Sequence, residues 1–273
     1  MWYKLLVLFL SMPSVMVAQE LFIFSEPAST MPKKAIMFRM NSRHYTDPSG
    51  YYYKLNPELG YGLAKNLMGH IEGYYSNWAL QSGAMDGVGM NFKYRFFSQD
   101  GVHKHKRLAV TGKVIYSFYP LSMQWMLEDG NTSLISAGLI YTQLIHKFAI
   151  SGKINYLKPF TGGNVPINYV TNGELLQWQI SSGLLTFPME YRNYKQVNVN
   201  VYVEYLGQQN LGLQNSSDLP ASHAINHDLG LGLQFIFSSR FTTELAYRMN
   251  LGGNLNRMTN SMYYFNVEYM LFR

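Results

Sequence analysis

The chain has 273 residues and a formal net charge of +6, and 14% of its residues are charged while 15% are aromatic. Soluble domains usually contain about 25% charged residues, so this composition argues against an ordinary soluble domain. The absence of cysteine excludes disulfide bonds and a cysteine-linked lipid anchor. Lys and Arg are scattered, with no basic helix or aromatic-basic motif, so we expect no nucleic-acid partner.

The N-terminus has the parts of a secretory signal peptide. Lys4 supplies a positive charge, Leu5 to Leu10 form an apolar core, and Val15 to Ala18 precede a predicted cleavage before Gln19. The apolar run is too short to span a bilayer as a helix, and no later stretch approaches about 18 consecutive apolar residues. We therefore predict that residues 1–18 are a signal peptide and that the protein is exported.

Residues 19–33 lie between this cleavage site and the first predicted strand, and they contain Pro27 and Pro32. We expect a periplasmic N-terminal segment here. It is either a tether or a small plug that folds into the interior of the following domain, and the sequence does not choose between the two.

From residue 34 onward, apolar and polar side chains alternate with a period of two. In Gln196 to Leu206, for example, Val197, Val199, Val201, Val203 and Tyr205 share one face, and Asn198, Asn200, Tyr202 and Glu204 share the other. This period predicts strands with one apolar and one polar face. At about 3.3 Å per residue and a tilt of about 45°, such a strand crosses roughly 25 Å, the apolar band of an outer membrane. In chain order, we predict twelve strands: 34–44, 52–63, 67–77, 87–98, 105–118, 133–145, 148–157, 174–187, 196–206, 227–237, 241–250 and 260–272.

One predicted strand is ambiguous. In 133–145, one possible apolar face holds Ile135, Leu139 and Tyr141, and the competing face holds Leu134, Ile140 and Leu144. The pattern alone does not say which face points outward.

The connections between the predicted strands alternate in length. Those after even-numbered strands are mostly short turns, such as Lys65-Asn66 and His146-Lys147, and those after odd-numbered strands are mostly longer: 45–51, 78–86, 119–132, 158–173, 207–226 and 251–259. Short turns at one rim and longer loops at the other are typical of outer-membrane barrels. An even number of strands then brings both chain ends to the short-turn, periplasmic rim.

The last predicted strand is strongly aromatic. Alternate residues Tyr263, Phe265, Val267, Tyr269 and Leu271 lead to the terminal Phe272-Arg273. In this and in its strand pattern the chain resembles Gram-negative outer-membrane β-barrels of the porin and transporter class, over residues 34–273. Such barrels usually end on Phe itself, whereas this chain ends on Arg273. The resemblance implies an outer-membrane location, contact with outer-membrane lipids and lipopolysaccharide, recognition of the last strand by the barrel-insertion machinery, and a role in permeability. It transfers no catalytic residue.

The main alternative fold is a secreted β-sandwich, whose strands are typically about 5–6 residues long. Many of the predicted strands are twice that length, and a closed barrel leaves no unpaired strand edge in a membrane. We therefore predict an all-β fold, a single closed antiparallel transmembrane β-barrel of about twelve strands.

If the apolar faces meet lipid, the polar faces line the lumen. Parity places basic residues mainly on the fourth, fifth and seventh strands, where we predict a basic arc of Lys93, Arg95, Arg107, Lys113 and Lys153. Acidic residues lie mainly on the ninth to twelfth strands, and we predict an acidic arc of Glu58, Glu72, Glu204, Asp228, Glu244 and Glu268. The same parity places Arg39 and Arg248 in the lumen, outside the basic arc. Opposed arcs would create a field that orients dipolar solutes and disfavours apolar ones.

These features favour a passive, porin-like channel for small polar or charged solutes. Barrels of about eight strands are filled by side chains and those of 16–18 hold channels, so a barrel of intermediate size also allows the charges to pair into a structural network. The alternative is a closed outer-membrane barrel that acts as a lipid hydrolase or in surface interactions.

A lipid hydrolase would need a Ser within reach of a His and an orienting residue. His70 and Glu72 share a strand face and His227 adjoins Asp228, but the sequence has no His-x-Ser signature of barrel phospholipases. His103 and His105 have a spacing that suits a metal ion, yet the adjacent cations disfavour one. We therefore expect no enzymatic activity, no metal site and no cofactor.

Overall fold

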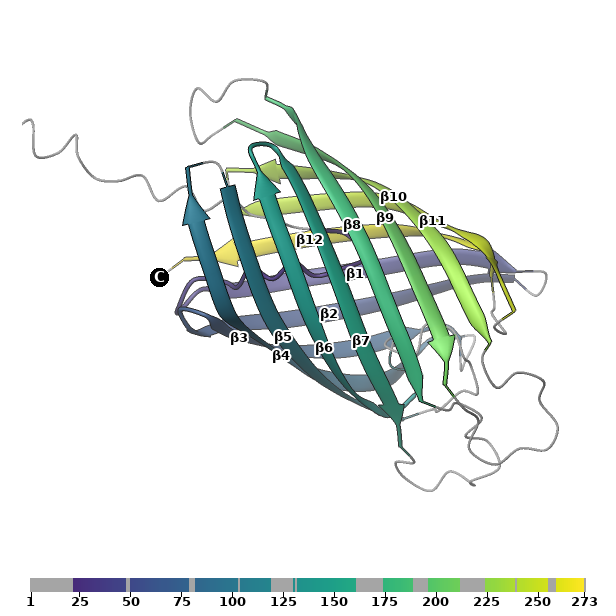
Figure 1. Cartoon of the computed structure of the whole chain (residues 1–273). Helices are drawn as coiled ribbons and strands as arrows, with labels where there is room; N and C mark the ends of the chain where they lie inside the picture. Colours follow the sequence, from purple (N-terminus) through teal and green to yellow (C-terminus); the bar gives the residue numbers. More distant parts are fainter. Residues whose placement is uncertain are drawn as a thin grey trace, which may run out of the picture.

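The computed structural model describes residues 22–47, 50–78, 82–102, 104–118, 130, 132–160, 174–188, 196–211, 224–238, 240–254 and 259–272. Within these ranges, twelve antiparallel strands form one closed barrel, in which each strand pairs with its neighbours in sequence and the first strand pairs with the last (Figure 1). The predicted all-β, twelve-stranded closed barrel is thus confirmed. The described residues include no helix of the length and apolar character needed to cross a membrane.

Each predicted strand corresponds to one strand of the barrel, with ends that differ by a few residues. In chain order the strands are β1 (Ile36–Asp47), β2 (Gly50–Ala64), β3 (Leu67–Ser76), β4 (Ala84–Gly101), β5 (Lys104–Ser117), β6 (Leu134–Ile145), β7 (Phe148–Pro159), β8 (Leu175–Phe187), β9 (Asn198–Asn210), β10 (Ile225–Phe237), β11 (Phe241–Gly253) and β12 (Ser261–Leu271).

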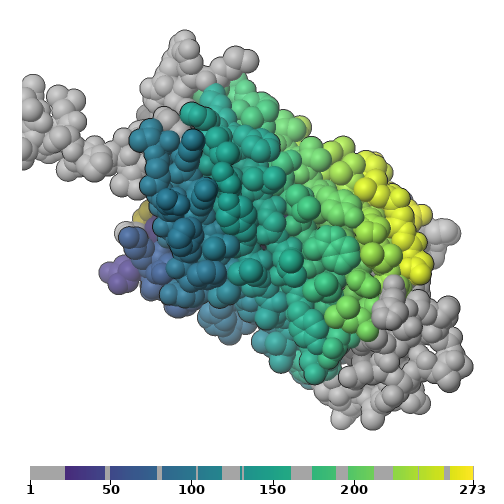
Figure 2. All heavy atoms as spheres, viewed as in Figure 1, coloured from purple at the N-terminus to yellow at the C-terminus, as the bar shows by residue number. Residues whose placement is uncertain are grey.

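Alternate residues of the strands point outward and form an apolar band around the barrel. On β9, Val201 and Val203 are 38% and 45% exposed, whereas Tyr202 and Glu204 are 4% and 1% exposed. The period of two therefore separates an apolar exterior from an interior face, as lipid outside and polar groups inside require. Figure 2 shows the strands packed side by side into a continuous wall on the face in view.

The exposure of alternate residues also shows which face of the ambiguous strand β6 points outward. Ile135 and Leu139 are exposed on the outer face, whereas Leu134 and Ile140 are fully buried. Leu134 packs in the interior with Tyr74, Ile115, Leu157 and Leu175. An apolar patch inside the lumen is the reason that the sequence pattern of this strand was ambiguous.

The short turns gather at one rim, which also holds the paired ends Ile36 and Leu271. The connections at this rim span 65–66, 102–103, 146–147, 188–197 and 238–240, and those at the other rim span 48–49, 77–83, 118–133, 160–174, 211–224 and 254–260. One predicted long connection is wrong: β1 and β2 continue to the pair Asp47 and Gly50, leaving only 48–49 between them. In this added part of the β1–β2 pair, aromatic rings of the two strands stack on one another. The ring centroids of Tyr45 and Tyr52 are 5.8 Å apart.

Residues 22–35, which we call the luminal segment, lie mostly inside the barrel, and Lys33 and Lys34 near their end are exposed. Phe22 and Ile23 are each 6% exposed. They pack in the interior against Ala149, Tyr202, Ala246 and Tyr264. Of the two alternatives left open by the sequence for residues 19–33, the position of residues 22–33 in the interior fits the plug. Residues 1–21, including the predicted signal peptide, lie outside the described residues.

Two glycines of β10 make room for this segment. A Cβ at Gly230 would lie 2.6 Å from the ring of Phe24, and a Cβ at Gly232 would lie 2.1 Å from Cδ1 of Ile23. Larger residues at these positions would occupy the space that the luminal segment fills.

Candidate functional site

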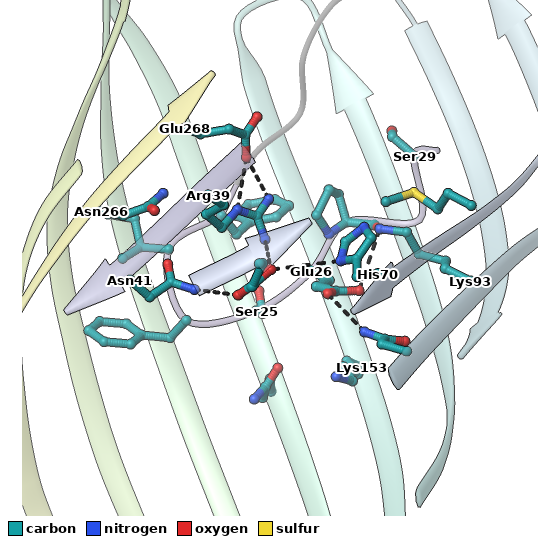
Figure 3. Close-up of a pocket in the computed structure, with 18 of the residues that line it drawn as sticks. Ser25, Glu26, Ser29, Arg39, Asn41, His70, Lys93, Lys153, Asn266 and Glu268 are labelled. Carbon is teal, nitrogen blue, oxygen red and sulfur yellow. Dashed lines mark hydrogen bonds and ion pairs between the residues drawn. The ribbon is translucent and has the colours of Figure 1, made fainter. Parts of the chain in front are cut away.

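The polar interior of the barrel surrounds a cavity of about 680 Å³ beside the luminal segment (Figure 3). This volume lies in the range of roughly 300–1,000 Å³ that is usual for small-molecule sites. Charged and amide side chains from both sides of the barrel line the cavity, together with the luminal segment itself.

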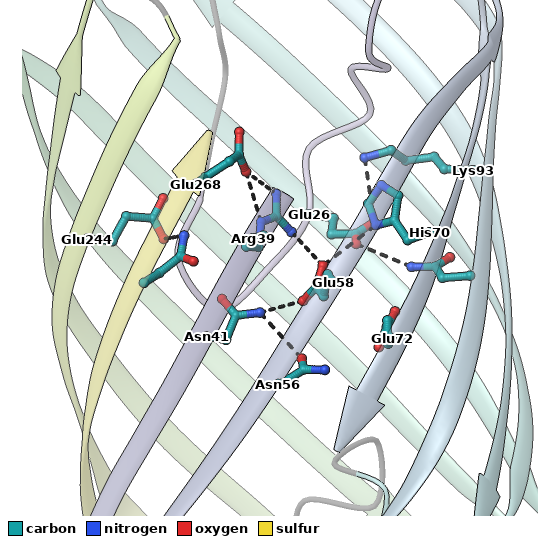
Figure 4. A network of polar contacts seen from close by, with 12 residues as sticks. Glu26, Arg39, Asn41, Asn56, Glu58, His70, Glu72, Lys93, Glu244 and Glu268 are labelled. Carbon is teal, nitrogen blue, oxygen red and sulfur yellow. Dashed lines mark hydrogen bonds and ion pairs between the residues drawn. The ribbon is translucent and has the colours of Figure 1, made fainter. Parts of the chain in front are cut away.

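A row of charges crosses β12, β1, β2 and β3 (Figure 4). Arg39 lies directly opposite Glu268 on one neighbouring strand and Glu58 on the other. Its Nε and Nη2 atoms donate to Glu268 Oε2 over 2.8 and 2.6 Å, and Nη1 donates to Glu58 Oε2 over 3.2 Å. Asn41 donates to the other oxygen of Glu58. One guanidinium thus compensates two carboxylates of the predicted acidic arc.

Glu72 continues this row on β3, directly opposite Glu58. Lys113 Nζ lies 2.8 Å from its Oε2 atom, and the Tyr74 hydroxyl donates to the same carboxylate over 2.5 Å. Lys113 belongs to β5 and reaches across β4, where the residue opposite Glu72 is Gly89 and presents no side chain. A member of the basic arc therefore contacts a member of the acidic arc directly.

The acidic residues of β10 and β11 have local partners. Asp228 binds Arg248, whose Nε lies 2.8 Å from Asp228 Oδ2. Glu244 accepts from Gln234 Nε2 over 2.6 Å and from Asn266 Nδ2 over 3.0 Å. Amide donors therefore satisfy the hydrogen bonding of this buried carboxylate.

Glu204 of β9 binds the luminal segment. Its Oε1 atom accepts from the backbone amides of Ile23 and Phe24 over 2.8 and 2.9 Å. Its Oε2 atom accepts from the Ser181 hydroxyl over 2.7 Å, and Ser181 in turn contacts Ser25 over 2.6 Å. Hydrogen bonds to a charged acceptor are stronger than those between neutral groups, so Glu204 is a principal anchor of this segment.

Three members of the basic arc also contact the luminal segment or a turn. Lys93 Nζ donates to the carbonyl of Pro27 over 3.0 Å, and Arg107 Nη1 donates to the Ser29 hydroxyl over 2.7 Å. Arg95 Nη2 donates to the carbonyl of Lys65 over 3.3 Å. The fifth member, Lys153, lines the cavity from β7.

The luminal segment thus lies between Lys93 and Glu204, so the two predicted arcs do not face one another across an open lumen. Strand parity indicated the side on which each charge lies, but it did not indicate its partner. Sequence analysis missed Glu26, which lies 3.5 Å from Lys93 Nζ through its Oε2 atom. It also left the compensating role of Arg39 unassigned, although parity placed Arg39 in the lumen.

Of the two histidines considered for catalysis, His70 lies with its Nδ1 atom 3.7 Å from Glu58 Oε2. The His227 ring bonds the Tyr205 hydroxyl over 2.6 Å and stacks on its ring, apart from the buried Asp228. The sequence analysis did not consider His44, which contacts the Ser42 hydroxyl on β1. Ser42 is 7% exposed. Across the described ranges, no group of three or more His, Asp or Glu residues is placed to hold a metal ion.

No protein-family model and no curated protein matches this sequence. Solved structures that resemble the barrel include the following two. An outer membrane channel from Pseudomonas putida F1 has a TM-score of 0.60 and 9% identity, with 89% of this chain and 98% of that chain covered. The NanC porin has a TM-score of 0.52 and 10% identity, with 87% of this chain and 99% of that chain covered. The protein therefore has the fold of outer-membrane channels and porins.

Proposed function

We propose that the protein is a passive, porin-like channel of the Gram-negative outer membrane for small polar or charged solutes. The observation that carries this proposal is the combination of an apolar outer band with a polar lumen around a cavity of about 680 Å³. An apolar exterior suits lipid, and a lumen of charged and amide groups suits water and polar solutes. The similarity in fold to an outer membrane channel and a porin supports the proposal.

The luminal segment limits the size of the solute. It occupies part of the interior of a twelve-stranded barrel, whose lumen is already narrower than that of barrels with 16–18 strands. Solutes would pass beside this segment, through the cavity that it lines together with the strands. The channel is therefore proposed for small molecules.

The proposed orientation places the short-turn rim and both chain ends in the periplasm. Its support is that the ends of β1 and β12 pair at the rim that holds most of the short turns. In this orientation, the aromatic strand β12 would be read by the barrel-insertion machinery. The outer band would contact lipids and lipopolysaccharide.

Conductance of the mature protein in planar bilayers tests the proposed function. We expect discrete openings in KCl from protein whose folding is shown by a heat-dependent change in gel migration. Liposomes that contain the protein should swell with small sugars and exclude larger ones. Folded protein that gives neither openings nor swelling would refute the proposal.

A further inference from the structure

The β4–β5 hairpin continues beyond the end of β3 at the short-turn rim. The ladder between β3 and β4 ends at Tyr94, and the next amide of β4, that of Arg95, donates to the Asn66 carbonyl over 2.8 Å. On its other side, β4 stays paired with β5 as far as Gly101. In the described part of the chain, no strand therefore pairs with Phe96–Gly101 on the β3 side. We call this stretch the free edge of β4.

The free edge lies in water and not in the hydrocarbon of the membrane, where unpaired backbone N–H and C=O groups are not tolerated. Every residue from Phe96 to Gly101 is exposed, whereas the inward residues Asn91 and Lys93 of the same strand are buried. A bulge in β4 leaves both Phe96 and Phe97 exposed, by 49% and 43%. Exposed aromatic rings in water are typical of surfaces that bind a partner.

An unpaired strand edge is a template on which another strand can form hydrogen bonds. Pro and Lys often protect such edges in natural proteins, and neither occurs in Phe96–Gly101. The one charged residue of this stretch, Asp100, is engaged on the inner face of the hairpin. Its Oδ1 atom lies 2.7 Å from Nδ1 of His105 and 3.3 Å from Nη2 of Arg107. The backbone of the edge therefore stays open to an added strand.

The outer face of the same hairpin is basic, because it carries the exposed residues Lys104 and Lys106. The residues opposite these two lysines are Gly101 and Gln99 on β4, and Ile145 and Gln143 on β6. None of them is acidic, so the paired strands do not compensate the charge of the lysines. This face is therefore complementary to an acidic partner.

Lys104 is also placed to reach a strand that pairs with the free edge. The residue opposite it on β4 is Gly101, which has no side chain to block its path. The lumen contains a precedent: Lys113 of β5 passes Gly89 of β4 and meets Glu72 of β3, with Nζ 2.8 Å from Oε2. An acidic residue opposite Gly101 on an added strand would take the place that Glu72 has in this pair.

We propose that the free edge of β4 binds an extended, acidic segment of a periplasmic polypeptide, which adds to the barrel as a further strand. In such binding, backbone hydrogen bonds provide affinity and alternate side chains provide specificity. The expected segment has an acidic residue opposite Gly101 and a β-branched residue opposite Phe97, because aromatic and β-branched residues form favourable cross-strand pairs.

A second copy of the chain does not fit the free edge. Strands of membrane barrels tilt by about 35–45°, so two copies related by a two-fold axis along the membrane normal would cross their β4 strands at roughly 70–90° and could not pair them. The inference does not depend on the channel function. It uses the proposed orientation only to name the periplasm as the compartment of the partner.

A fluorescent synthetic peptide of sequence ETETVT, blocked at both ends, has the expected pattern in antiparallel register and serves as the probe. Fluorescence anisotropy with folded protein in detergent should show saturable binding. The peptide ETPPVT lacks backbone donors because proline has no N–H, and KTKTVT reverses the charge, so each should bind at least about tenfold more weakly. Absence of saturable ETETVT binding would overturn the proposal. Equal affinity of the proline peptide would overturn strand addition, and equal affinity of the lysine peptide would overturn the acidic partner.

Two further measurements locate the binding. Lys104→Gln should weaken ETETVT binding roughly three- to tenfold, whereas Lys158→Gln, which removes a 62% exposed lysine of β7 at the other rim, should leave it unchanged. Equal affinities of these two variants would contradict the role of Lys104. Hydrogen exchange of the amides in residues 96–101 should slow when the peptide binds, and protection confined to other strands would overturn the site. Bilayer openings without peptide binding would overturn this inference alone.

Discussion

Glu204 is the residue whose replacement tests most directly whether the luminal segment closes part of the lumen. The Glu204 side chain is 1% exposed and accepts two backbone N–H groups of the segment. Glu204→Ala removes both hydrogen bonds and leaves the two N–H groups of Ile23 and Phe24 in a buried site. The strand itself keeps its backbone pairing with β8 and β10, so the barrel should fold.

The expected size of the effect follows from these two hydrogen bonds. A hydrogen bond to a charged group contributes about 1.5–3 kcal/mol, so the docked state of the segment should lose roughly 3–6 kcal/mol. Water that enters the space left by the side chain will replace part of this loss. At 1.4 kcal/mol per factor of ten, even the lower figure raises the undocked population about a hundredfold.

Two measurements read this change. Hydrogen exchange should show faster exchange of the amides in residues 22–35 of the Ala variant, and bilayer recordings should show more frequent openings of high conductance. Glu204→Gln is the control, because its amide oxygen still accepts from the two backbone N–H groups and its amide nitrogen can donate to Ser181. Because it keeps both hydrogen bonds but loses the charge, it should lie between the Ala variant and the unmodified protein. An Ala variant with unchanged exchange and unchanged conductance would refute the reasoning.

Three further predictions concern other parts of the lumen. Arg39→Ala leaves two buried carboxylates without their shared cation, so the barrel should lose about 3–5 kcal/mol of stability. The heat-dependent shift in gel migration should then occur at a lower temperature, and an unchanged temperature would contradict this. Lys113→Gln leaves its carboxylate partner uncompensated, so the reversal potential in a KCl gradient should move toward cation selectivity; no change would mean that this pair lies off the ion path. Gly230→Val puts a side chain where the Phe24 ring lies and should raise conductance, whereas Gly112→Val, at a position where a Cβ meets no atom within 4 Å, should not. Equal conductance of these two variants would argue against the plug.

The strands could be predicted from the sequence because their cause is local. Each outward residue meets lipid and the next residue meets the interior. Apolar and polar residues therefore alternate in the sequence of each strand. The prediction was wrong where this rule does not decide the structure. β1 and β2 extend to Asp47 and Gly50 through an aromatic ladder at the rim, and loop-forming residues there suggested a longer connection.

The luminal segment and the charge partners could not be predicted in the same way, because they depend on contacts between residues far apart in the chain. Ile23 and Glu204 are separated by 181 positions. Parity assigned Arg39 to the lumen, but its two partners follow from the strand register, which sets Glu58 and Glu268 directly opposite it. The barrel closes where β1 pairs with β12. Which residues of these two strands lie opposite one another cannot be predicted from a single sequence.

The inward face of β9 shows how the sequence of the lumen reflects its contents. In a water-filled pore, the apolar ring of Tyr202 would face water, which is unfavourable. Tyr202 instead packs against Phe22, with ring centroids 5.7 Å apart, and Glu204 binds the backbone of the next two residues. Barrel residues also bond both side chains, through Gln234 for the Tyr202 hydroxyl and Ser181 for Glu204 Oε2. The docked segment adds the cover over the Tyr202 ring and the two donors to Glu204 Oε1. This face of β9 therefore holds the luminal segment in place.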